Sequence, residues 1–317
     1  MDAPEYDPFA PGRFSVGVRT IEASDLVRGR VFPCEIWYPA QPGKAQPLIV
    51  FSHSSGGNRR SATFLATHLA SHGYVVAAMD HSEIVAAELR RREGETDADR
   101  AARVAAVIAS RVPDIRFIID QLLGARGTDI ALDAARIGLV GHSFGGWTVL
   151  ATAEVEPRVR SVVAMGPGGS TNPRPGILPL TLTFDWGRDV PTLYLAAEED
   201  VMIPLASVYE LFDRTPASKH LFILRRADHQ HFIDDVEGEH EALRAMSLPG
   251  EAAWIPAAMR PIAELSSGEQ AHVFVRGLTL AHLDATLRQS DAAQRFLAGD
   301  VEAELAKHGI EAIAHRP

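Results

Sequence analysis

The sequence predicts an α/β fold in which a mostly parallel β-sheet carries helices on both faces. Two observations support this prediction. Short apolar runs rich in Val, Ile and Leu alternate along the chain with longer helix-like segments, as parallel strands alternate with their crossover helices. The apolar run at 137–140 also leads straight into residues 141–146, Gly-His-Ser-Phe-Gly-Gly, which is the pattern of a strand, a sharp turn and a helix.

Strands are expected wherever such an apolar run is bounded by turn-forming residues. Residues 14–40 alternate between polar and apolar side chains and end in Trp37-Tyr38-Pro39, which is typical of strands at the edge of a sheet. The buried strands are expected at 47–51, 74–79, 137–140, 159–165, 192–196 and 220–224.

Helices are expected between these strands. Residues 64–72 fit a helix that ends at Gly73, and the helix after the serine turn is expected to begin near Gly146. Residues 113–123 place apolar side chains at i, i+3, i+4 and i+7, with a proline near the start and Gly124 at the end.

We expect a single domain over residues 1–317, because large α/β folds often exceed 250 residues as one domain. Two stretches have the character of insertions. They are the charged, helix-like residues 84–111 and the residues 236–270, which are rich in Glu, Ala, Met and Pro. The second stretch is a candidate lid over the site described next, or else a surface excursion.

Charge and composition narrow the possible partners. The chain is 46% hydrophobic and 23% charged, an ordinary globular balance, and its net charge of -10 argues against nucleic acid or an anionic membrane as a partner. The basic cluster at 90–92 is followed at once by Glu93 and Glu95, so we interpret it as a solvated face. The expected partner is a small molecule, and the sequence does not indicate the oligomeric state.

The cysteine content and the apolar runs of the sequence indicate where in the cell the protein is expected. The single cysteine, Cys34, lies in a strand-like stretch and excludes an intrachain disulfide framework. Residues 1–5 carry no basic or apolar leader pattern, and no run approaches the roughly 20 apolar residues of a membrane span. We therefore expect a cytoplasmic protein without stable membrane insertion.

The turn at 141–146 predicts a nucleophilic serine, Ser143. In a Gly-x-Ser-x-Gly elbow the serine lies in a strained turn at the end of the sheet, and the glycines on either side avoid collisions with the neighbouring strand and helix. His142 shares this rigid turn and cannot face the Ser143 hydroxyl, so we interpret it as a packing residue rather than a base.

A serine hydroxyl needs a base to take its proton, and the base needs a carboxylate to orient it. In this kind of site the chain order is Ser, then Asp or Glu, then His, at successive strand ends. Asp200 comes a few residues after the strand at 192–196, so it is the predicted acid. Glu198 and Glu199 are interpreted as its solvated neighbours.

The predicted base follows the strand at 220–224. His229 is the first choice and His231 the alternative. A metal site made of Asp228, His229 and His231 is a rival hypothesis, but no further ligands occur at a familiar spacing. We therefore expect neither a metal nor an organic cofactor.

The negative oxygen that forms during acyl transfer needs two hydrogen-bond donors. One is expected to be the backbone N–H of Phe144, directly after the serine. The other is expected in the loop at 52–60, where Ser55 N–H is the first choice and Ser54 the alternative. The competing interpretation is a loop that only caps the next helix.

Four segments of the chain also match the pattern of a known family. They are residues 37–40 (Trp-Tyr-Pro-Ala), 50–57 (Val-Phe-Ser-His-Ser-Ser-Gly-Gly), 141–146 and 227–229 (Ala-Asp-His). Together they resemble the α/β-hydrolases of the dienelactone hydrolase and platelet-activating factor acetylhydrolase group. The resemblance runs from about residue 12 to 235 and implies the α/β-hydrolase fold.

The chain departs from these relatives at informative positions. Dienelactone hydrolases proper have a cysteine where this chain has Ser143, and the usual His-Gly-X of the oxyanion loop reads His-Ser-Ser at 53–55. Animal acetylhydrolases place the acid after an earlier strand, where this chain reads Gly-Pro-Gly at 166–168. The resemblance therefore favours a bacterial esterase-like branch with Asp200 as the acid.

The expected function is a serine-dependent carboxylic ester hydrolase that acts on a small-molecule ester through an acyl-enzyme. An acyltransferase or a peptidase using the same triad is the nearest alternative, and tests with acceptors and substrates separate them. A non-catalytic binding protein of the same fold is the alternative from another class. It predicts no labelling by a serine-reactive phosphonate.

Overall fold

The computed structural model describes residues 6–41, 44–124 and 130–315. Over these residues the chain builds one nine-stranded sheet in the order β1-β2-β4-β3-β5-β6-β7-β8-β9. The strands are β1 (Val16–Asp25), β2 (Arg30–Pro39), β3 (Gln46–Ser52), β4 (Val75–Met79), β5 (Leu132–His142), β6 (Val159–Met165), β7 (Thr192–Ala197), β8 (Lys219–Leu224) and β9 (Ala312–His315).

The centre of the sheet is parallel and its two ends are antiparallel. The six central strands pair in parallel, in the order β4, β3, β5, β6, β7 and β8. At one end β1 pairs antiparallel with β2, and β2 with β4; at the other end β9 pairs antiparallel with β8. Every strand expected from an apolar run is present, and residues 14–40 contain the edge pair β1–β2 as expected. The short strand β9 was not predicted.

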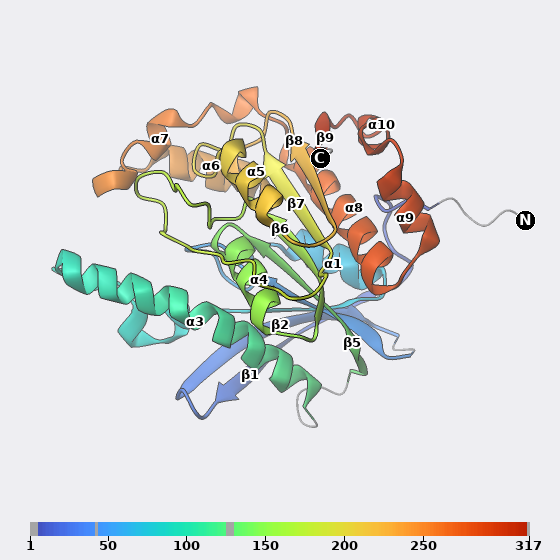
Figure 1. The fold of residues 1–317 in the computed structure, drawn as a ribbon, viewed down its shortest axis with the longest axis horizontal. Coiled ribbons are helices and arrows are strands. Elements are labelled where there is room, and N and C mark those ends of the chain that lie inside the picture. The colour runs from blue at the N-terminus through green and yellow to red at the C-terminus, as the bar shows by residue number, and fades with distance from the viewer. Residues whose placement is uncertain (1–5, 42–43, 125–129, 316–317) are drawn as a thin grey trace, which may run out of the picture.

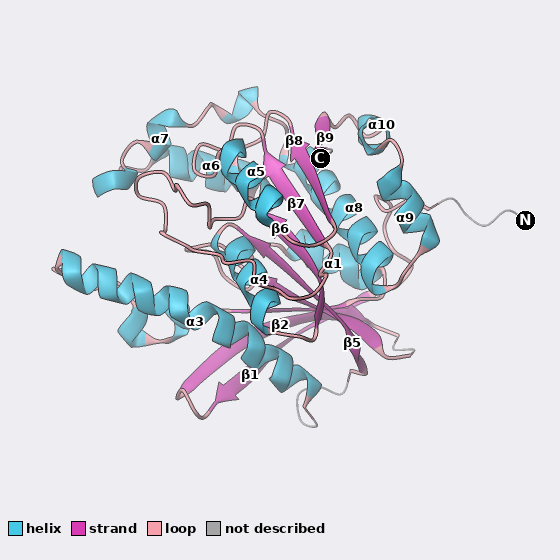
Figure 2. Ribbon diagram, viewed as in Figure 1, coloured by secondary structure: helices cyan, strands magenta, loops and turns pink. Residues whose placement is uncertain are grey.

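Helices cover both faces of this sheet, as Figures 1 and 2 show. One buried cluster packs α1 and α8 to α10 against the sheet, and a second packs α3 to α5 against the opposite face. The helices are α1 (Thr63–Ser71), α2 (Ser82–Val85), α3 (Asp97–Leu123), α4 (Phe144–Val155), α5 (Leu205–Arg214), α6 (Val236–Ala245), α7 (Ile255–Ala258), α8 (Gly268–Leu287), α9 (Asp291–Ala298) and α10 (Val301–Ala306).

The structure corrects the expected start of the helix at 113–123. Helix α3 begins sixteen residues earlier, after a capping box at Thr96, and carries Pro113 inside it; only the end at Gly124 agrees with the prediction. A proline inside a helix removes one backbone hydrogen bond, at a cost of about 3 kcal/mol. The neighbouring side chains Arg111 and Asp114 are fully buried, so tertiary contacts keep this part of the chain helical.

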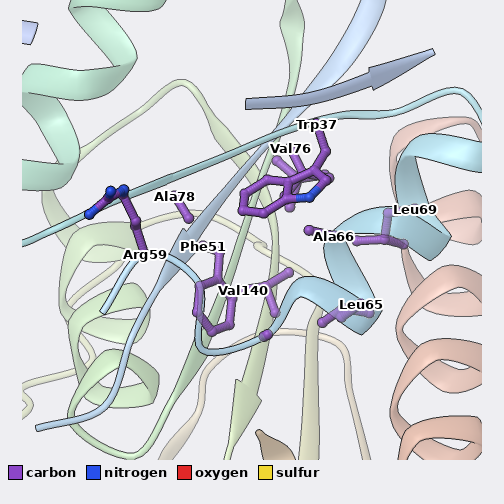
Figure 3. A pocket seen from close by; sticks show the side chains of 11 residues that line it. Trp37, Phe51, Arg59, Leu65, Ala66, Leu69, Val76, Ala78 and Val140 are labelled. Atoms are coloured by element: carbon purple, nitrogen blue, oxygen red, sulfur yellow. The ribbon is translucent and has the colours of Figure 1, made fainter. Parts of the chain in front are cut away.

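A small cavity lies between α1 and the sheet, and Figure 3 shows the side chains around it. Its volume is about 10 Å³, and its walls include Trp37, Phe51 and Leu65, with Arg59 at one side. This is about the room that one water molecule needs. The cavity is therefore a packing gap in the core rather than a ligand site.

The structure also shows how Cys34 is placed and whether a helix could span a membrane. Cys34 is buried in β2, and burial together with the nearby Glu35 raises the pKa of its thiol to about 12, so it is a packed thiol at neutral pH. None of the helices in the described part of the chain combines the length and the apolar composition that a membrane span requires.

Candidate active site

Ser143 occupies a strained turn between β5 and α4. Its backbone angles are φ 58° and ψ -115°, a region that residues with a side chain rarely adopt. The N–H of Ser143 donates to the carbonyl of Met165 at 2.8 Å, which ties the turn to the end of β6. Helix α4 begins at Phe144, two residues before the expected start.

The glycines beside Ser143 are required by close backbone contacts. A Cβ on Gly141 would lie 2.2 Å from the carbonyl oxygen of Gly145. A Cβ on Gly145 would lie 1.9 Å from the carbonyl oxygen of Ser52, on the neighbouring strand. Both distances are far inside van der Waals contact, so the steric reason predicted for the elbow pattern is confirmed.

Gly145→Ala is therefore expected to destabilise the protein by about 1–3 kcal/mol, since the added methyl group forces α4 away from β3. The free energy of unfolding, measured in urea, checks this. Gly299→Ala is the matched control, because Gly299 has a negative φ of -83° and its nearest contact would be at 3.3 Å. Equal stabilities of the two variants would show that Gly145 does not approach the backbone of Ser52 closely enough to exclude a side chain.

Asp200 and His229 form a buried pair at the ends of β7 and β8. His229 Nδ1 lies 2.6 Å from Asp200 Oδ2. The other carboxylate oxygen accepts the N–H groups of Met202 and Ile203 at 2.9 and 2.8 Å. The carboxylate is thus held from behind while one oxygen faces the imidazole, as a tautomer-fixing acid requires.

Gly166 lies beside the Asp200–His229 pair. It follows β6, and a Cβ placed on it would contact Asp200 Oδ2 and His229 Nδ1, each at 3.5 Å. The loop after β6 therefore borders the Asp200–His229 pair without supplying a carboxylate.

The electrostatics distinguish His229 from other buried histidines nearby. Burial disfavours the charged ring of His229, but the negative charge and hydrogen bond of Asp200 outweigh burial and raise the pKa of His229 above its usual value of 6.5. Burial lowers the pKa of His53, His81 and His142 well below that value. These three rings are therefore neutral at neutral pH.

His231 lies in a separate arrangement. Its Nδ1 is 2.9 Å from Asp228 Oδ1, and its Nε2 is 2.9 Å from the carbonyl oxygen of Ser266. Asp228 and His231 therefore form one pair, whereas His229 pairs with Asp200, so the side chains of Asp228, His229 and His231 do not converge. In the described residues no group of three such side chains is placed to hold a metal ion.

His142 packs beside the pair, as expected of a residue in the rigid turn. Its ring centre lies 4.7 Å from that of His229 and 5.4 Å from that of Phe232. Because His142 is neutral, it adds no positive charge that would oppose protonation of His229.

The loop after β3 carries Ser55, and a buried arginine holds this loop from behind. Arg111 donates to the carbonyl of His53 at 2.8 Å and to that of Ser54 at 3.4 Å. Its guanidinium carbon also lies 4.1 Å from the centre of the Phe144 ring. Arg111 therefore links the two segments that carry the predicted oxyanion donors.

A second buried contact fixes the same loop. The N–H of His81 donates to His53 Nε2 at 3.3 Å, and His81 Nε2 lies 2.9 Å from Ser52 Oγ. Its Nδ1 faces Asp114 Oδ2 at 3.2 Å. Helix α3 thus supports the loop through both Arg111 and Asp114.

Sequence reasoning missed these supporting residues, although one signal was present. Arg111 lies four residues before Ile115, on the same helical face as the apolar stripe. Arginine is rarely buried without a partner, so an arginine on such a stripe indicates a specific polar role. The proline at 113 hid this signal because it suggested that the helix begins later.

A cavity of about 550 Å³ opens over the elbow, and we call it the main cavity. Ser143 and His229 both line it, and so do Phe144 and Ser55. The structure therefore places the predicted nucleophile, base and oxyanion residues around one space, with Asp200 behind the base.

The remaining walls come from the loop after β6, from the candidate lid at 236–270 and from polar side chains. From 166–188 and 236–270 the wall residues include Gly168, Ile177, Leu178, Leu180, Leu243, Met246 and Ile255. Its charged residues are Arg60, Asp234, Asp235 and Glu239. The main cavity thus combines apolar walls with polar ones, and carboxylates outnumber arginines among its charged residues.

Comparison with protein families identifies one match that spans most of the chain. A family model described as PETase, PET hydrolase-like, matches residues 9–248. This region contains Ser143, Asp200, His229 and the loop that carries Ser55, whereas Ile255 of the cavity wall lies beyond it.

Individual relatives are more distant. Platelet-activating factor acetylhydrolase of Cavia porcellus is 28% identical over 62% of this chain and 50% of its own length, which confirms the resemblance inferred from the sequence. Cutinase est1 of Thermobifida alba is 26% identical over 63% of this chain and 58% of its own length. The chain thus spans about half the length of the curated relatives it matches.

A solved structure gives the fold independently. Ferulic acid esterase from Streptomyces cinnamoneus superposes with a TM-score of 0.65 at 23% identity, over 89% of this chain and 93% of that one. The predicted α/β-hydrolase fold is confirmed.

Proposed function

This chain belongs to the PET hydrolase-like family, and we propose that it is a serine-dependent carboxylic ester hydrolase. One observation carries the proposal. A histidine hydrogen-bonded to a buried carboxylate lines the same cavity as a serine in a strained strand-to-helix turn. Esterases, acetylhydrolases and cutinases among the relatives support the same reaction class.

In the first half of the proposed reaction, Ser143 Oγ attacks the acyl carbon of the ester. His229 Nε2 takes the hydroxyl proton, and Asp200 holds the imidazole in the required tautomer. The N–H groups of Phe144 and Ser55 bind the negative oxygen of the tetrahedral intermediate. The C–O bond to the alcohol then breaks, and the proton on His229 goes to the leaving alcohol.

The second half returns the enzyme to its starting state. Water attacks the acyl-serine ester and gives its proton to His229. The tetrahedral intermediate collapses, Ser143 recovers its proton from His229, and the carboxylic acid leaves. One ester and one water thus yield one acid and one alcohol, with no cofactor.

We further propose that residues 236–270 act as a lid within a single domain. Leu243, Met246 and Ile255 from this stretch form apolar walls of the main cavity. In Figure 1, α6 and α7 lie together over one side of the sheet. A lid of this kind excludes water from the acyl-enzyme and restricts the size of the substrate.

The test combines a series of p-nitrophenyl esters, from acetate to long acyl chains, with labelling by a fluorophosphonate. Hydrolysis of the esters is expected, with the label found by mass spectrometry on the peptide that contains Ser143. Adding an alcohol such as methanol separates hydrolysis from acyl transfer, because a transferase forms the methyl ester in preference to the acid. If the protein is not labelled and hydrolyses none of the esters, the proposal is contradicted and a binding protein is favoured.

The pH profile should report His229. Neutral His229 is the active form, so kcat/KM is expected to rise with pH and to reach a plateau above the pKa of this residue. Because Asp200 raises that pKa, the midpoint should lie above about 6.5. A chemistry-limited ester measured from pH 5 to 9 checks this, and a flat profile would remove His229 as the base.

A further inference from the structure

A second cavity, of about 290 Å³, adjoins the main cavity at the oxyanion loop, and we call it the side cavity. The two cavities share Ser55, Phe144 and Leu178 in their walls. The side cavity is otherwise lined by Glu83, Leu89, Arg90, Arg91, Arg103, Val104 and Val107. These residues belong to the start of α3 and the segment before it, which Figure 1 shows extending beyond the sheet on the same side as α7.

The side cavity carries a local excess of positive charge. Three guanidinium groups line it, against the single carboxylate of Glu83. Glu83 is already paired with the buried Arg111. The wall of the side cavity is therefore opposite in sign to the chain as a whole, whose net charge is -10.

The three arginines differ in how they are held. Arg103 is fixed by two hydrogen bonds to Glu95, at 2.9 and 2.6 Å, and Arg90 donates to the carbonyl of Ile84 at 2.9 Å. Arg91 is exposed and makes no hydrogen bond or ion pair with the described residues, although its charge acts on Glu95. Arg91 therefore has donors to spare for a bound anion. The cluster interpreted from the sequence as a solvated face also forms a cavity wall.

The main cavity has the opposite character. Its charged residues are three carboxylates and Arg60, and Arg60 is itself paired with Glu35 at 2.7 Å. A negatively charged group on a substrate would be repelled there and attracted into the side cavity.

The site also fixes which part of an ester would enter the side cavity. The carbonyl oxygen belongs at the amides of Ser55 and Phe144, which both cavities share. The alcohol oxygen must lie within reach of His229, which lines the main cavity and not the side cavity. Of the two parts of the ester, the acyl chain is therefore the one that would extend toward the side cavity, whose apolar wall residues include Leu89, Val104 and Val107.

We propose that the side cavity binds a carboxylate at the far end of the acyl chain, so that the preferred substrates are half-esters of dicarboxylic acids. The carboxylate lies at Arg91, with Arg90 and Arg103 beside it, and an apolar spacer joins it to the ester carbonyl. This proposal rests on the proposed esterase function. Hydrolysis consumes one water and releases the alcohol and the free dicarboxylic acid.

The test compares two p-nitrophenyl esters that differ only in the end of the acyl chain. In p-nitrophenyl hydrogen adipate this end is a carboxylate, and in p-nitrophenyl hexanoate it is a methyl group. The measured quantity is the ratio of kcat/KM for adipate to that for hexanoate. In the wild type this ratio should exceed one and fall as salt is added, because an exposed ion pair is screened.

Arginine variants then locate the carboxylate. Arg91→Ala is expected to lower the ratio about fivefold and Arg91→Glu about 20-fold, as removal and reversal of one exposed charge predict. Arg92→Ala is the matched control, since it removes the same charge from the same cluster but does not line either cavity. It should leave the ratio unchanged.

The outcomes separate this proposal from the esterase function. If hexanoate is hydrolysed but Arg91→Ala and Arg92→Ala change the ratio equally, the side-cavity proposal is wrong and the esterase function stands. If Arg91→Ala instead slows hydrolysis of an ester with its carboxylate on the alcohol, such as 4-acetoxybenzoate, the assignment of the acyl chain is overturned. If neither p-nitrophenyl ester is hydrolysed, the esterase function itself fails.

Discussion

Ser143→Ala should lower kcat for p-nitrophenyl esters by about 10⁶-fold, the scale of loss when a catalytic serine is removed from such a triad. Alanine has no atom that can form the acyl-enzyme. His229, Asp200 and the two proposed oxyanion donors, the N–H groups of Phe144 and Ser55, remain in place, so the residual rate should come from binding and electrostatic stabilisation alone. Steady-state kinetics on highly purified protein measures the loss, since traces of another esterase would hide it.

The variant also needs a matched serine control. Ser61→Ala removes a hydroxyl from the wall of the same cavity, where the Ser61 side chain accepts a hydrogen bond from the N–H of Asn58. It should keep most of its activity and its phosphonate labelling, whereas Ser143→Ala should lose both. Equal activity of the two alanine variants would move the nucleophile elsewhere.

The strands were predictable because parallel strands are buried on both faces and read as continuous apolar runs. Residues 159–165 coincide with β6, and 192–196 fall one residue short of β7. The edge strand β9 escaped detection since it has only four residues, Ala-Ile-Ala-His, none of which is buried, so its apolar stretch is too short to indicate a strand.

The elbow was predictable for a local reason. Gly141 and Gly145 face backbone atoms at distances that no side chain permits, and the requirement is met within five residues of the sequence. The pairing of Asp200 with His229 needed only one more assumption, that successive parallel strands end at the same edge of the sheet.

The support of the loop that carries Ser55, the predicted oxyanion donor, was not predictable from local pattern. It depends on Arg111 in α3 reaching carbonyls of a loop almost sixty residues earlier in the chain. Such a contact has no fixed spacing, and a proline two residues further on pointed to a helix boundary. The side cavity has the same origin, because its arginines acquire a role only through the position of α3 beside Phe144 and Leu178.

Asp200→Asn is expected to lower kcat by about 10⁴-fold while the fold is kept. Two controls accompany it. Glu199→Gln changes a neighbouring carboxylate that is paired with Arg260 at the surface, and it should leave kcat nearly unchanged. Asp228→Asn tests the alternative base, because Asp228 contacts His231. If Asp228→Asn lost most of its activity while Asp200→Asn stayed active, His231 rather than His229 would be the base.

The size of the Asp200→Asn effect follows from the hydrogen bonds around the carboxylate. The N–H groups of Met202 and Ile203 both donate to Oδ1, so the asparagine oxygen must occupy that position. Its NH₂ group then takes the place of Oδ2 and donates to Nδ1 of His229. With Nδ1 accepting, the ring proton sits on Nε2, and the imidazole can no longer take the proton of Ser143. The variant also loses the charge that raises the pKa of His229, so the midpoint of its remaining pH profile should move down.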